Sequence, residues 1–197
     1  IGDASTSEGH FWETVNAAGV VQAPLAIVVF DDGYGISVPT KLQTTKGSIS
    51  EALKGTLIKE SNYFESLKWR YFGPIDGHDV EQVEQALQQA KKYAHPVIVH
   101  MITQKGKGYD PAVLNDADQF HAVGQINPET GESLEVSASS WTSVYGDELV
   151  KAAEVNPRIV AITGAMLNPV GLAKFAERFP NRVFDVGIAE QHAVTSA

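Results

Sequence analysis

The sequence contains no cysteine and few basic residues. Without cysteine, the chain of 197 residues cannot form a disulfide, a thiolate metal site or a cysteine nucleophile. It carries 15 lysines and arginines against 24 acidic residues, a formal net charge of −9. Because clustered basic side chains hold nucleic-acid phosphates, this balance argues against a nucleic-acid partner. A small phosphorylated ligand stays compatible with the charge, since a metal ion can hold its phosphates.

Long apolar runs are also missing. The longest, PLAIVVF (24–30), is far shorter than the ~20 residues that cross a bilayer. No charged leader precedes an apolar segment, so we predict a cytoplasmic protein without a membrane partner. The chain opens on IGD without an initiator methionine and closes inside the helical pattern GIAEQHAVTSA. We therefore expect a fold that is incomplete at both ends.

Short apolar runs alternate with helical patterns along the chain, which predicts parallel sheets with flanking helices, an α/β fold. Predicted strands lie at 24–30, 71–75, 95–103, 158–163 and 182–186. Predicted helices lie at 7–21, 59–71, 80–93, 141–154, 171–179 and from Ala189 onward, and a loop with a short helix is predicted within 44–55. Ser7 and Asp79 are candidate helix caps. A long irregular stretch begins at Lys105, and we predict one domain at 1–120, a linker at 121–138 and a second domain at 139–197.

Acidic residues follow the ends of two predicted strands near the N-terminus. Asp3 comes after what reads as a strand end, and Asp31 and Asp32 come after the strand 24–30. In open parallel sheets, ligands bind beyond the carboxyl ends of the strands. Oxygen ligands from two neighbouring strand ends suit Mg²⁺, which usually brings phosphates with it. The same spacing fits plain turns equally well, so both interpretations stay open.

Small residues surround the first of these acids. They would let a diphosphate approach the backbone and the start of the following helix. These small residues are Gly2, Ala4 and Ser5.

The spacing between Asp3 and Asp32 resembles the GDG…N motif of thiamine-diphosphate enzymes. The resemblance implies that Asp3, Asp32 and the carbonyl of Tyr34 hold the Mg²⁺ that anchors the cofactor's diphosphate. The sequence departs from the motif twice, because Ala4 replaces its last glycine and Asp32 replaces its asparagine. A second carboxylate suits Mg²⁺ but adds negative charge beside a diphosphate. Ile36 matches the apolar residue that packs against the cofactor's central ring, although an ordinary core position explains it equally well.

The segment DVGIAEQHAV (185–194) resembles the part of transketolase-like enzymes that carries their catalytic glutamate. The resemblance implies that Glu190 bonds the aminopyrimidine ring of the cofactor and promotes its activation. Such a carboxyl group needs an apolar pocket and a raised pKa. Without this context, the plainer interpretation is that Glu190 is an acid in the first turn of a helix, where the helix dipole stabilises its negative charge.

From about residue 57 onward, several long motifs resemble the 1-deoxy-D-xylulose-5-phosphate synthase family in the same order. They are YFGPIDGHD (71–79), VIVHMITQKGKGYDPA (97–112) and FHAVGQINPETGE (120–132). The resemblance implies a homodimeric enzyme of isoprenoid and thiamine biosynthesis that condenses pyruvate with glyceraldehyde 3-phosphate and releases CO₂. His78 takes the place of the family's active-site histidine in DGHD. Lys105 takes a place that can meet the cofactor's phosphates. The resemblance also implies that 1–120 is the C-terminal part of a diphosphate-binding domain and 139–197 the N-terminal part of a pyrimidine-binding domain.

Residues 1–55 instead resemble the first component of 2-oxo acid dehydrogenases. The stretch between Asp32 and the YFGPIDGHD motif is also shorter than the synthase family's usual one. Three alternatives follow: a synthase, a dehydrogenase component that passes a two-carbon unit to a lipoyl group, or a truncated scaffold without catalysis.

Overall fold

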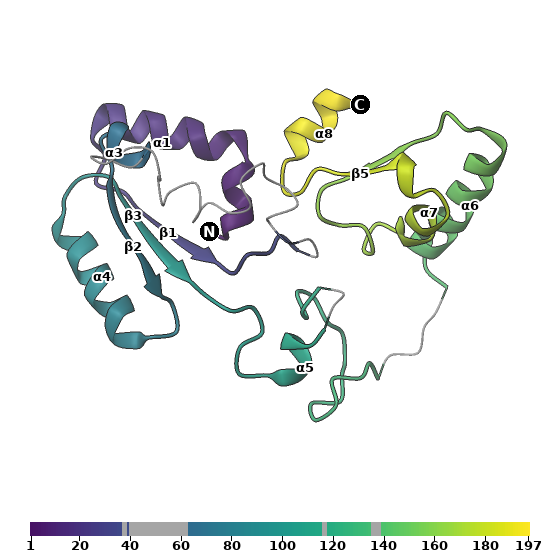
Figure 1. Cartoon of the computed structure of the whole chain (residues 1–197), viewed down its shortest axis with the longest axis horizontal. Helices are drawn as coiled ribbons and strands as arrows, with labels where there is room; N and C mark the ends of the chain where they lie inside the picture. The colour runs from purple at the N-terminus through teal and green to yellow at the C-terminus, as the bar shows by residue number, and fades with distance from the viewer. Residues whose placement is uncertain (37–38, 40–62, 116–117, 135–138) are drawn as a thin grey trace. The chain divides into compact units, whose positions relative to one another are not determined.

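The computed structural model describes residues 1–36, 39, 63–115, 118–134 and 139–197. Its strands run parallel and alternate with helices, which confirms the predicted α/β fold (Figure 1). Contacts divide the chain into two compact units, one with the described residues up to Lys105 except Ile36, and one with Ile36 and Gly106–Ala197. The short helix predicted within 44–55 lies outside the described residues. Within them, no helix is long and apolar enough to cross a bilayer.

The N-terminal unit is built on a three-stranded parallel sheet in the order β1-β3-β2. Its elements are η1 (Asp3–Ser7), α1 (Gly9–Val21), β1 (Ala26–Asp31), α3 (Tyr63–Ser66), β2 (Arg70–Asp76), α4 (Val80–Lys92) and β3 (Val97–Ile102). Asp31 of β1 and Asp76 of β2 both pair with Ile102 of β3. The carboxyl ends of all three strands therefore lie level at one edge of the sheet.

The central strand β3 separates two apolar clusters. Its residues Val97, Val99 and Met101 pack with Ala86 and Ala90 of α4. On the alternate positions, Ile98 joins the cluster that contains Phe11 and Val15 of α1 and Phe64 of α3. This alternation follows the two-residue period of a strand. The apolar run predicted as a buried strand is confirmed, since its first five residues are all buried.

Helix α1 lies close to the turn between α3 and β2. Trp69, which is 2% exposed, donates from its indole nitrogen to the carbonyl of Val15 at 2.7 Å. A Cβ atom built on Gly19 would lie 2.2 Å from the carbonyl oxygen of Leu67. Glycine at this position therefore permits the backbone of the turn to approach the helix.

Helix α4 begins where the sequence predicts. Asp79 accepts hydrogen bonds from the backbone N–H groups of Glu81 and Gln82, which confirms it as the cap. The side-chain and backbone hydrogen bonds from Gln82 lower the pKa of the Asp79 carboxyl below its usual value. The helix buries only part of its apolar side chains, because Val80 and Leu87 are exposed.

Two local predictions in this unit are wrong. Ser7 does not cap the first helix: it ends the 3-10 helix η1, and α1 has Glu8 at its N-cap without a side-chain hydrogen bond. The predicted helix 59–71 is described only from Tyr63, and it ends at Ser66. The residues after it turn back to start β2 at Arg70, whose N–H donates to the carbonyl of Pro96. Pairing with β3 therefore overrides the helical pattern.

The C-terminal unit holds a two-stranded parallel sheet of β4 and β5. Its elements are α5 (Asp110–Val113), α6 (Trp141–Val155), β4 (Ala161–Thr163), α7 (Ala173–Arg178), η3 (Pro180–Arg182), β5 (Val183–Asp185) and α8 (Glu190–Ser196). All four predicted elements between 141 and 186 and the helix near Ala189 are present, with shorter strands. The predicted domain and linker boundaries stay a prediction.

Arg182 ties the end of α6 to the core of this unit. Its guanidinium donates to the carbonyls of Ala153, Asn156 and Ile159 at 3.2–3.3 Å. The same group lies 3.7 Å from the ring centroid of Phe179. The charge thus satisfies carbonyls at the helix C-terminus that have no partner within the helix.

Replacing Gly19 with alanine tests the close packing of α1. Because the added methyl group would meet a backbone carbonyl, we expect the free energy of unfolding to fall by about 1–3 kcal/mol in urea titrations followed by circular dichroism. Gly9→Ala is the matched control, since a Cβ on Gly9 meets nothing within 4 Å. Equal stability of the two variants would contradict this packing.

Candidate functional site

The N-terminal segment runs beside β1 as a further parallel strand end. Gly2 forms a parallel bridge with Phe30, and the Phe30 N–H donates to the Ile1 carbonyl at 2.9 Å. Asp3 follows directly and is 1% exposed. The expected position of Asp3 at a strand end beside β1 is therefore confirmed.

The residues after Asp3 form the 3-10 helix η1, and α1 starts only at Gly9. The short 3-10 helix η1 therefore separates Asp3 from the start of α1, where the sequence predicts that a ligand would bind. The Thr6 hydroxyl donates to the Asp3 carbonyl at 2.6 Å, which closes this turn. Ala4 is buried and Ser5 half-buried, whereas Gly2 is exposed and a Cβ built on it meets nothing within 4 Å.

The two acids at the end of β1 have different surroundings. Asp31 is 5% exposed and points into the unit. Asp32 is half-buried, and its Oδ1 accepts the Tyr34 N–H at 3.0 Å across Gly33, which has a φ of 73°. The small loop therefore places the Asp32 carboxylate and the backbone of Tyr34 side by side.

The oxygen atoms at this edge suit a hard cation. Asp3 and Asp32 offer carboxylates from neighbouring chain segments, and Tyr34 offers a carbonyl. Mg²⁺ usually takes one or two carboxylates and completes its shell with water and phosphate. Among the described residues, no group of three or more His, Cys, Asp or Glu side chains could hold a metal ion. A cation held by these oxygen atoms would therefore take the rest of its shell from water and a phosphate ligand.

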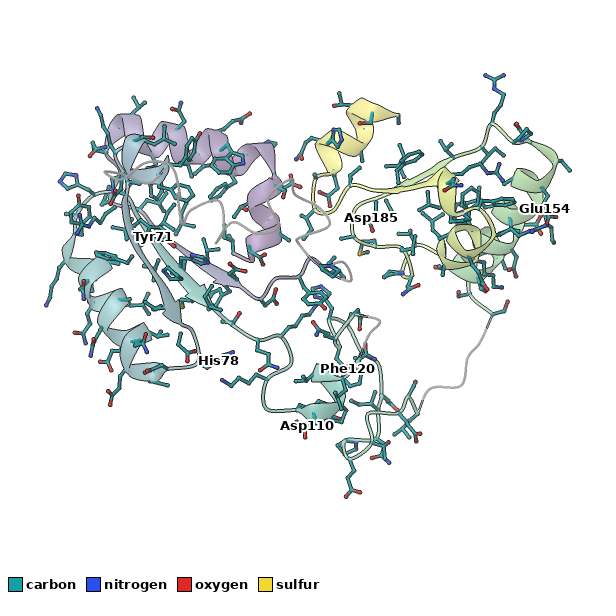
Figure 2. All side chains as sticks on the ribbon, in the orientation of Figure 1. Tyr71, His78, Asp110, Phe120, Glu154 and Asp185 are labelled. Atoms are coloured by element: carbon teal, nitrogen blue, oxygen red, sulfur yellow. The ribbon has the colours of Figure 1, made fainter. Side chains whose placement is uncertain are left out.

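The turn that carries His78 packs on the loop after β3. The Gly77 N–H donates to the Ile102 carbonyl at 2.8 Å, and the Gln104 N–H donates to Nε2 of His78 at 2.8 Å. Because Nε2 accepts, the ring proton of neutral His78 lies on Nδ1. His78 is exposed at the end of β2, as Figure 2 shows, and Lys105 is half-buried one residue beyond Gln104.

A buried polar chain in the same unit was missed by the sequence analysis. Nε2 of His100 lies 2.9 Å from Oδ2 of Asp31, and Nδ1 of His100 lies 2.6 Å from the hydroxyl of Tyr71. Burial and then the charge of Asp31 raise the pKa of the Tyr71 hydroxyl above its usual value. The available signal was one ionisable residue, His100, inside the otherwise apolar run VIVHMI.

In the C-terminal unit, Glu190 starts α8 beside a cavity of about 330 Å³. The lining is mostly apolar: Tyr145, Ile162, Thr163, Gly164, Met166, Val170, Leu172 and Glu190. A Cβ on Gly164 would lie 3.0 Å from the carbonyl oxygen of Gly187 and 3.5 Å, an ordinary contact distance, from Oε1 of Glu190. Glu190 is nevertheless exposed in this chain, whereas the sequence analysis expects a buried carboxyl group. The walls of the cavity are mostly apolar, but they leave Glu190 exposed to solvent.

Asp185 organises the loops on which Glu190 depends. Its Oδ1 accepts the N–H of Ala165 at 2.7 Å and the N–H of Gly187 at 2.9 Å. Ala165 is fully buried with a φ of 59°, a conformation that needs such support. One carboxylate at the end of β5 thereby joins the loop after β4 to the loop before α8 (Figure 2).

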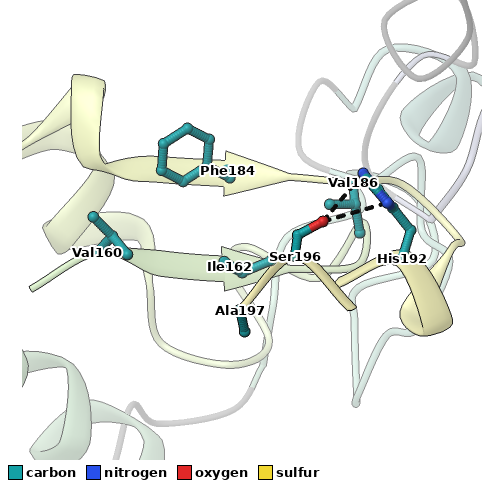
Figure 3. A pocket seen from close by; sticks show the side chains of 7 residues that line it. All are labelled: Val160, Ile162, Phe184, Val186, His192, Ser196 and Ala197. Carbon is teal, nitrogen blue, oxygen red and sulfur yellow. Dashed lines mark hydrogen bonds between the residues drawn. The ribbon is translucent and has the colours of Figure 1, made fainter. Parts of the chain in front are cut away.

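A second hollow of about 560 Å³ lies on the open face of the β4–β5 sheet. Figure 3 shows its lining, in which Ile162 of β4 and Phe184 of β5 stand on the sheet and His192 and Ser196 belong to α8. The Ser196 hydroxyl lies 3.3 Å from Nδ1 of His192. His192 therefore lines this hollow and Glu190 lines the smaller cavity. Ile36 is half-buried and belongs to the C-terminal unit by its contacts.

Comparisons with known proteins point to one group. A family model described as 1-deoxy-D-xylulose-5-phosphate synthase matches residues 36–103. Another, described as transketolase, pyrimidine binding domain, matches residues 137–197. The two models follow each other along the chain in the order that the sequence motifs predict.

Curated relatives carry the same name. The 1-deoxy-D-xylulose-5-phosphate synthase of Streptomyces griseus subsp. griseus is 43% identical over 232 residues, which cover 100% of this chain and 36% of the relative. The synthase of Clavibacter sepedonicus is 64% identical over 135 residues, 68% of this chain and 21% of its own length. A transketolase structure from Campylobacter jejuni aligns with 95% of this chain and 38% of its own at 16% identity and a TM-score of 0.43. The chain thus spans about a third of these relatives.

Removing the Asp185 carboxylate tests the support of the Glu190 region. In Asp185→Ala, we expect the amide protons of Ala165 and Gly187 to exchange with solvent at least about tenfold faster, because hydrogen bonds to a charged group contribute about 1.5–3 kcal/mol. Exchange measured by NMR gives the result. Asp147→Ala, which removes an exposed ion pair with Lys174, is the control with unchanged exchange at both amides. Unchanged exchange in Asp185→Ala would contradict this role.

Proposed function

We propose that this chain, which belongs to the transketolase-like thiamine-diphosphate enzyme family, forms part of an enzyme that makes 1-deoxy-D-xylulose 5-phosphate. The enzyme would condense pyruvate with glyceraldehyde 3-phosphate and release CO₂. The observation that carries the proposal is the 43% identity to a synthase across the whole chain. It favours this activity over a 2-oxo acid dehydrogenase component and over a scaffold. A homodimer in the cytoplasm belongs to the same proposal.

The acidic edge of the N-terminal unit is the proposed diphosphate site. Asp3, Asp32 and the carbonyl of Tyr34 would hold Mg²⁺, and Mg²⁺ would hold the diphosphate. Support comes from the bridge of Gly2 to β1 and from the loop that places Asp32 beside Tyr34. The small residues Gly2, Ala4 and Ser5 and the amine of Lys105 would meet the phosphate oxygens. This assignment uses oxygen ligands only, as Mg²⁺ prefers.

Glu190 is the proposed activating group. When bound, thiamine diphosphate supplies the electron sink for the decarboxylation of pyruvate. Glu190 would hold a hydrogen bond to the aminopyrimidine ring, and Ile36 would pack against the cofactor's central ring. A carboxyl group shifts its pKa upward when it is removed from water. Since Glu190 is exposed in the single chain, its role requires the bound cofactor and a second protein surface to cover the cavity.

His78 is proposed to contact the reacting substrate. Its Nε2 is occupied by the Gln104 N–H, so Nδ1–H is the group that can donate. A hydrogen bond from this position would stabilise negative charge on a substrate oxygen. An imidazole also exchanges protons near neutral pH, as an acid–base group in such a reaction must.

Cofactor binding by Asp32 variants tests the diphosphate site. We expect Asp32→Ala to weaken Mg²⁺-dependent binding of thiamine diphosphate at least about tenfold, because a charged ligand is lost. Asp32→Asn keeps an oxygen ligand and removes the extra charge beside the diphosphate, so its affinity should equal or exceed that of the unaltered chain. Isothermal titration calorimetry measures both, and Glu84→Gln on the exposed face of α4 is the control. Equal binding by Asp32→Ala and the control would contradict the site.

Turnover of a Glu190 variant tests the activating group. We expect Glu190→Gln to lower the formation of 1-deoxy-D-xylulose 5-phosphate by about 100-fold or more, the size of a general acid–base contribution, while thiamine diphosphate still binds. Product is measured by chromatography. Glu177→Gln, an exposed carboxylate on α7, serves as the control with unchanged turnover. Undiminished turnover of Glu190→Gln would contradict the assignment.

A further inference from the structure

We propose that Asp31, His100 and Tyr71 are positioning residues that hold the end of β1 in the conformation needed for the cation and diphosphate. The inference rests on the proposed function, because it concerns the same site. It adds three side chains that would not touch the cofactor. They would act through Asp32, the residue directly after Asp31.

The three side chains form one continuous chain of hydrogen bonds across the sheet. They come from β1, β3 and β2, and His100 stands in the middle with both ring nitrogens engaged. His100 is fully buried and Asp31 is 5% exposed. Tyr71 packs against the apolar cluster that contains Phe64, and its ring stacks on that of Phe64. The His100–Asp31 bond is therefore buried and the Tyr71–His100 bond is part-buried.

The direction of each hydrogen bond follows from the groups present. An ionised Asp31 carboxylate can only accept, so the proton of His100 lies on Nε2. Nδ1 is then an acceptor and receives the hydroxyl proton of Tyr71. The raised pKa of Tyr71 keeps this hydroxyl protonated as a donor. Tyr71 thus donates to His100 and His100 donates to Asp31, which carries the negative charge at the end of β1.

Asp31 is also fixed through its backbone. The Thr103 N–H donates to the Asp31 carbonyl at 2.8 Å, and the preceding residue, Phe30, bridges to Gly2. The segment that carries Asp3 therefore meets β1 one residue before Asp31, and Asp32 follows one residue after it. A rotation of Asp31 would move the start of the loop that places Asp32 beside Tyr34.

Stability alone gives a weak reason for such a chain. Taking an acid and an imidazole out of water is costly, and apolar side chains of similar volume often serve a core equally well or better. A fully bonded polar chain does, however, select one orientation for each of its members. Orientation is what a cation site at the end of β1 requires.

Two substitutions of His100 separate positioning from packing. In His100→Gln the amide group reaches the place of Nε2 and can donate to Asp31. In His100→Asn the shorter amide reaches the place of Nδ1 and can bond only Tyr71. We expect Mg²⁺-dependent binding of thiamine diphosphate, measured by calorimetry, to stay within about threefold in His100→Gln and to weaken about tenfold in His100→Asn, the loss of one charge-assisted bond.

Val29→Ala is the matched control, because Val29 of β1 is 1% exposed and is the register partner of His100. It should lower the unfolding midpoint while leaving cofactor affinity unchanged. Equal affinities of His100→Gln and His100→Asn, or losses that only follow the unfolding midpoints, would overturn the inference while the proposed function stands. Absence of binding by the unaltered chain would overturn both.

A spectroscopic measurement tests the hydrogen bonds of His100 without any cofactor. In ¹⁵N-resolved NMR spectra of the free protein, we expect His100 to show a protonated Nε2 and an unprotonated Nδ1. Tyr71→Phe keeps the ring and removes only the hydroxyl, so it should shift the Nδ1 signal. A proton on Nδ1 alone, or spectra unchanged in Tyr71→Phe, would overturn the inference.

Discussion

Parallel pairing of β1 and β2 on the central strand β3 is the constraint on which the N-terminal unit depends. Because Asp31 and Asp76 both lie opposite Ile102, the loops after all three strands leave the sheet at one level. That edge collects Asp32, His78 and the loop that leads to Lys105. The N-terminal segment adds Asp3 by its bridge to β1. The acidic edge thus follows from strand register rather than from a compact sequence motif.

Much of this arrangement follows from the sequence, and its exceptions have physical reasons. The buried strand β3, the cap at Asp79 and the position of Asp3 beside β1 were all predictable, because apolar runs and turn chemistry are local signals. Ser7 was predicted wrongly because the local 3-10 helix η1 includes it, and the helix 59–71 because pairing with β3 decides where β2 begins. The bonds of His100 join residues up to 69 positions apart, which no local pattern reports.

The proposed site residues of the two units differ in their electrostatic surroundings. At the acidic edge, Asp31 is bonded by His100 inside the unit, which leaves Asp3, Asp32 and the Tyr34 carbonyl as the proposed cation ligands. A cation would relieve the repulsion between the two carboxylates and a diphosphate. In the C-terminal unit, Glu190 has apolar walls and loops held by Asp185 but remains exposed. The sequence could predict which residue this is, but not which protein surface would bury its carboxyl group.

Paramagnetic NMR can locate a cation that is held at the acidic edge. Mn²⁺ added with thiamine diphosphate broadens the amide signals nearest to the bound ion. We expect selective broadening at Asp3, Asp32 and Tyr34, with the signals of α4 residues such as Glu84 retained. Broadening centred elsewhere, or the same weak broadening with and without thiamine diphosphate, would contradict the proposed cation site.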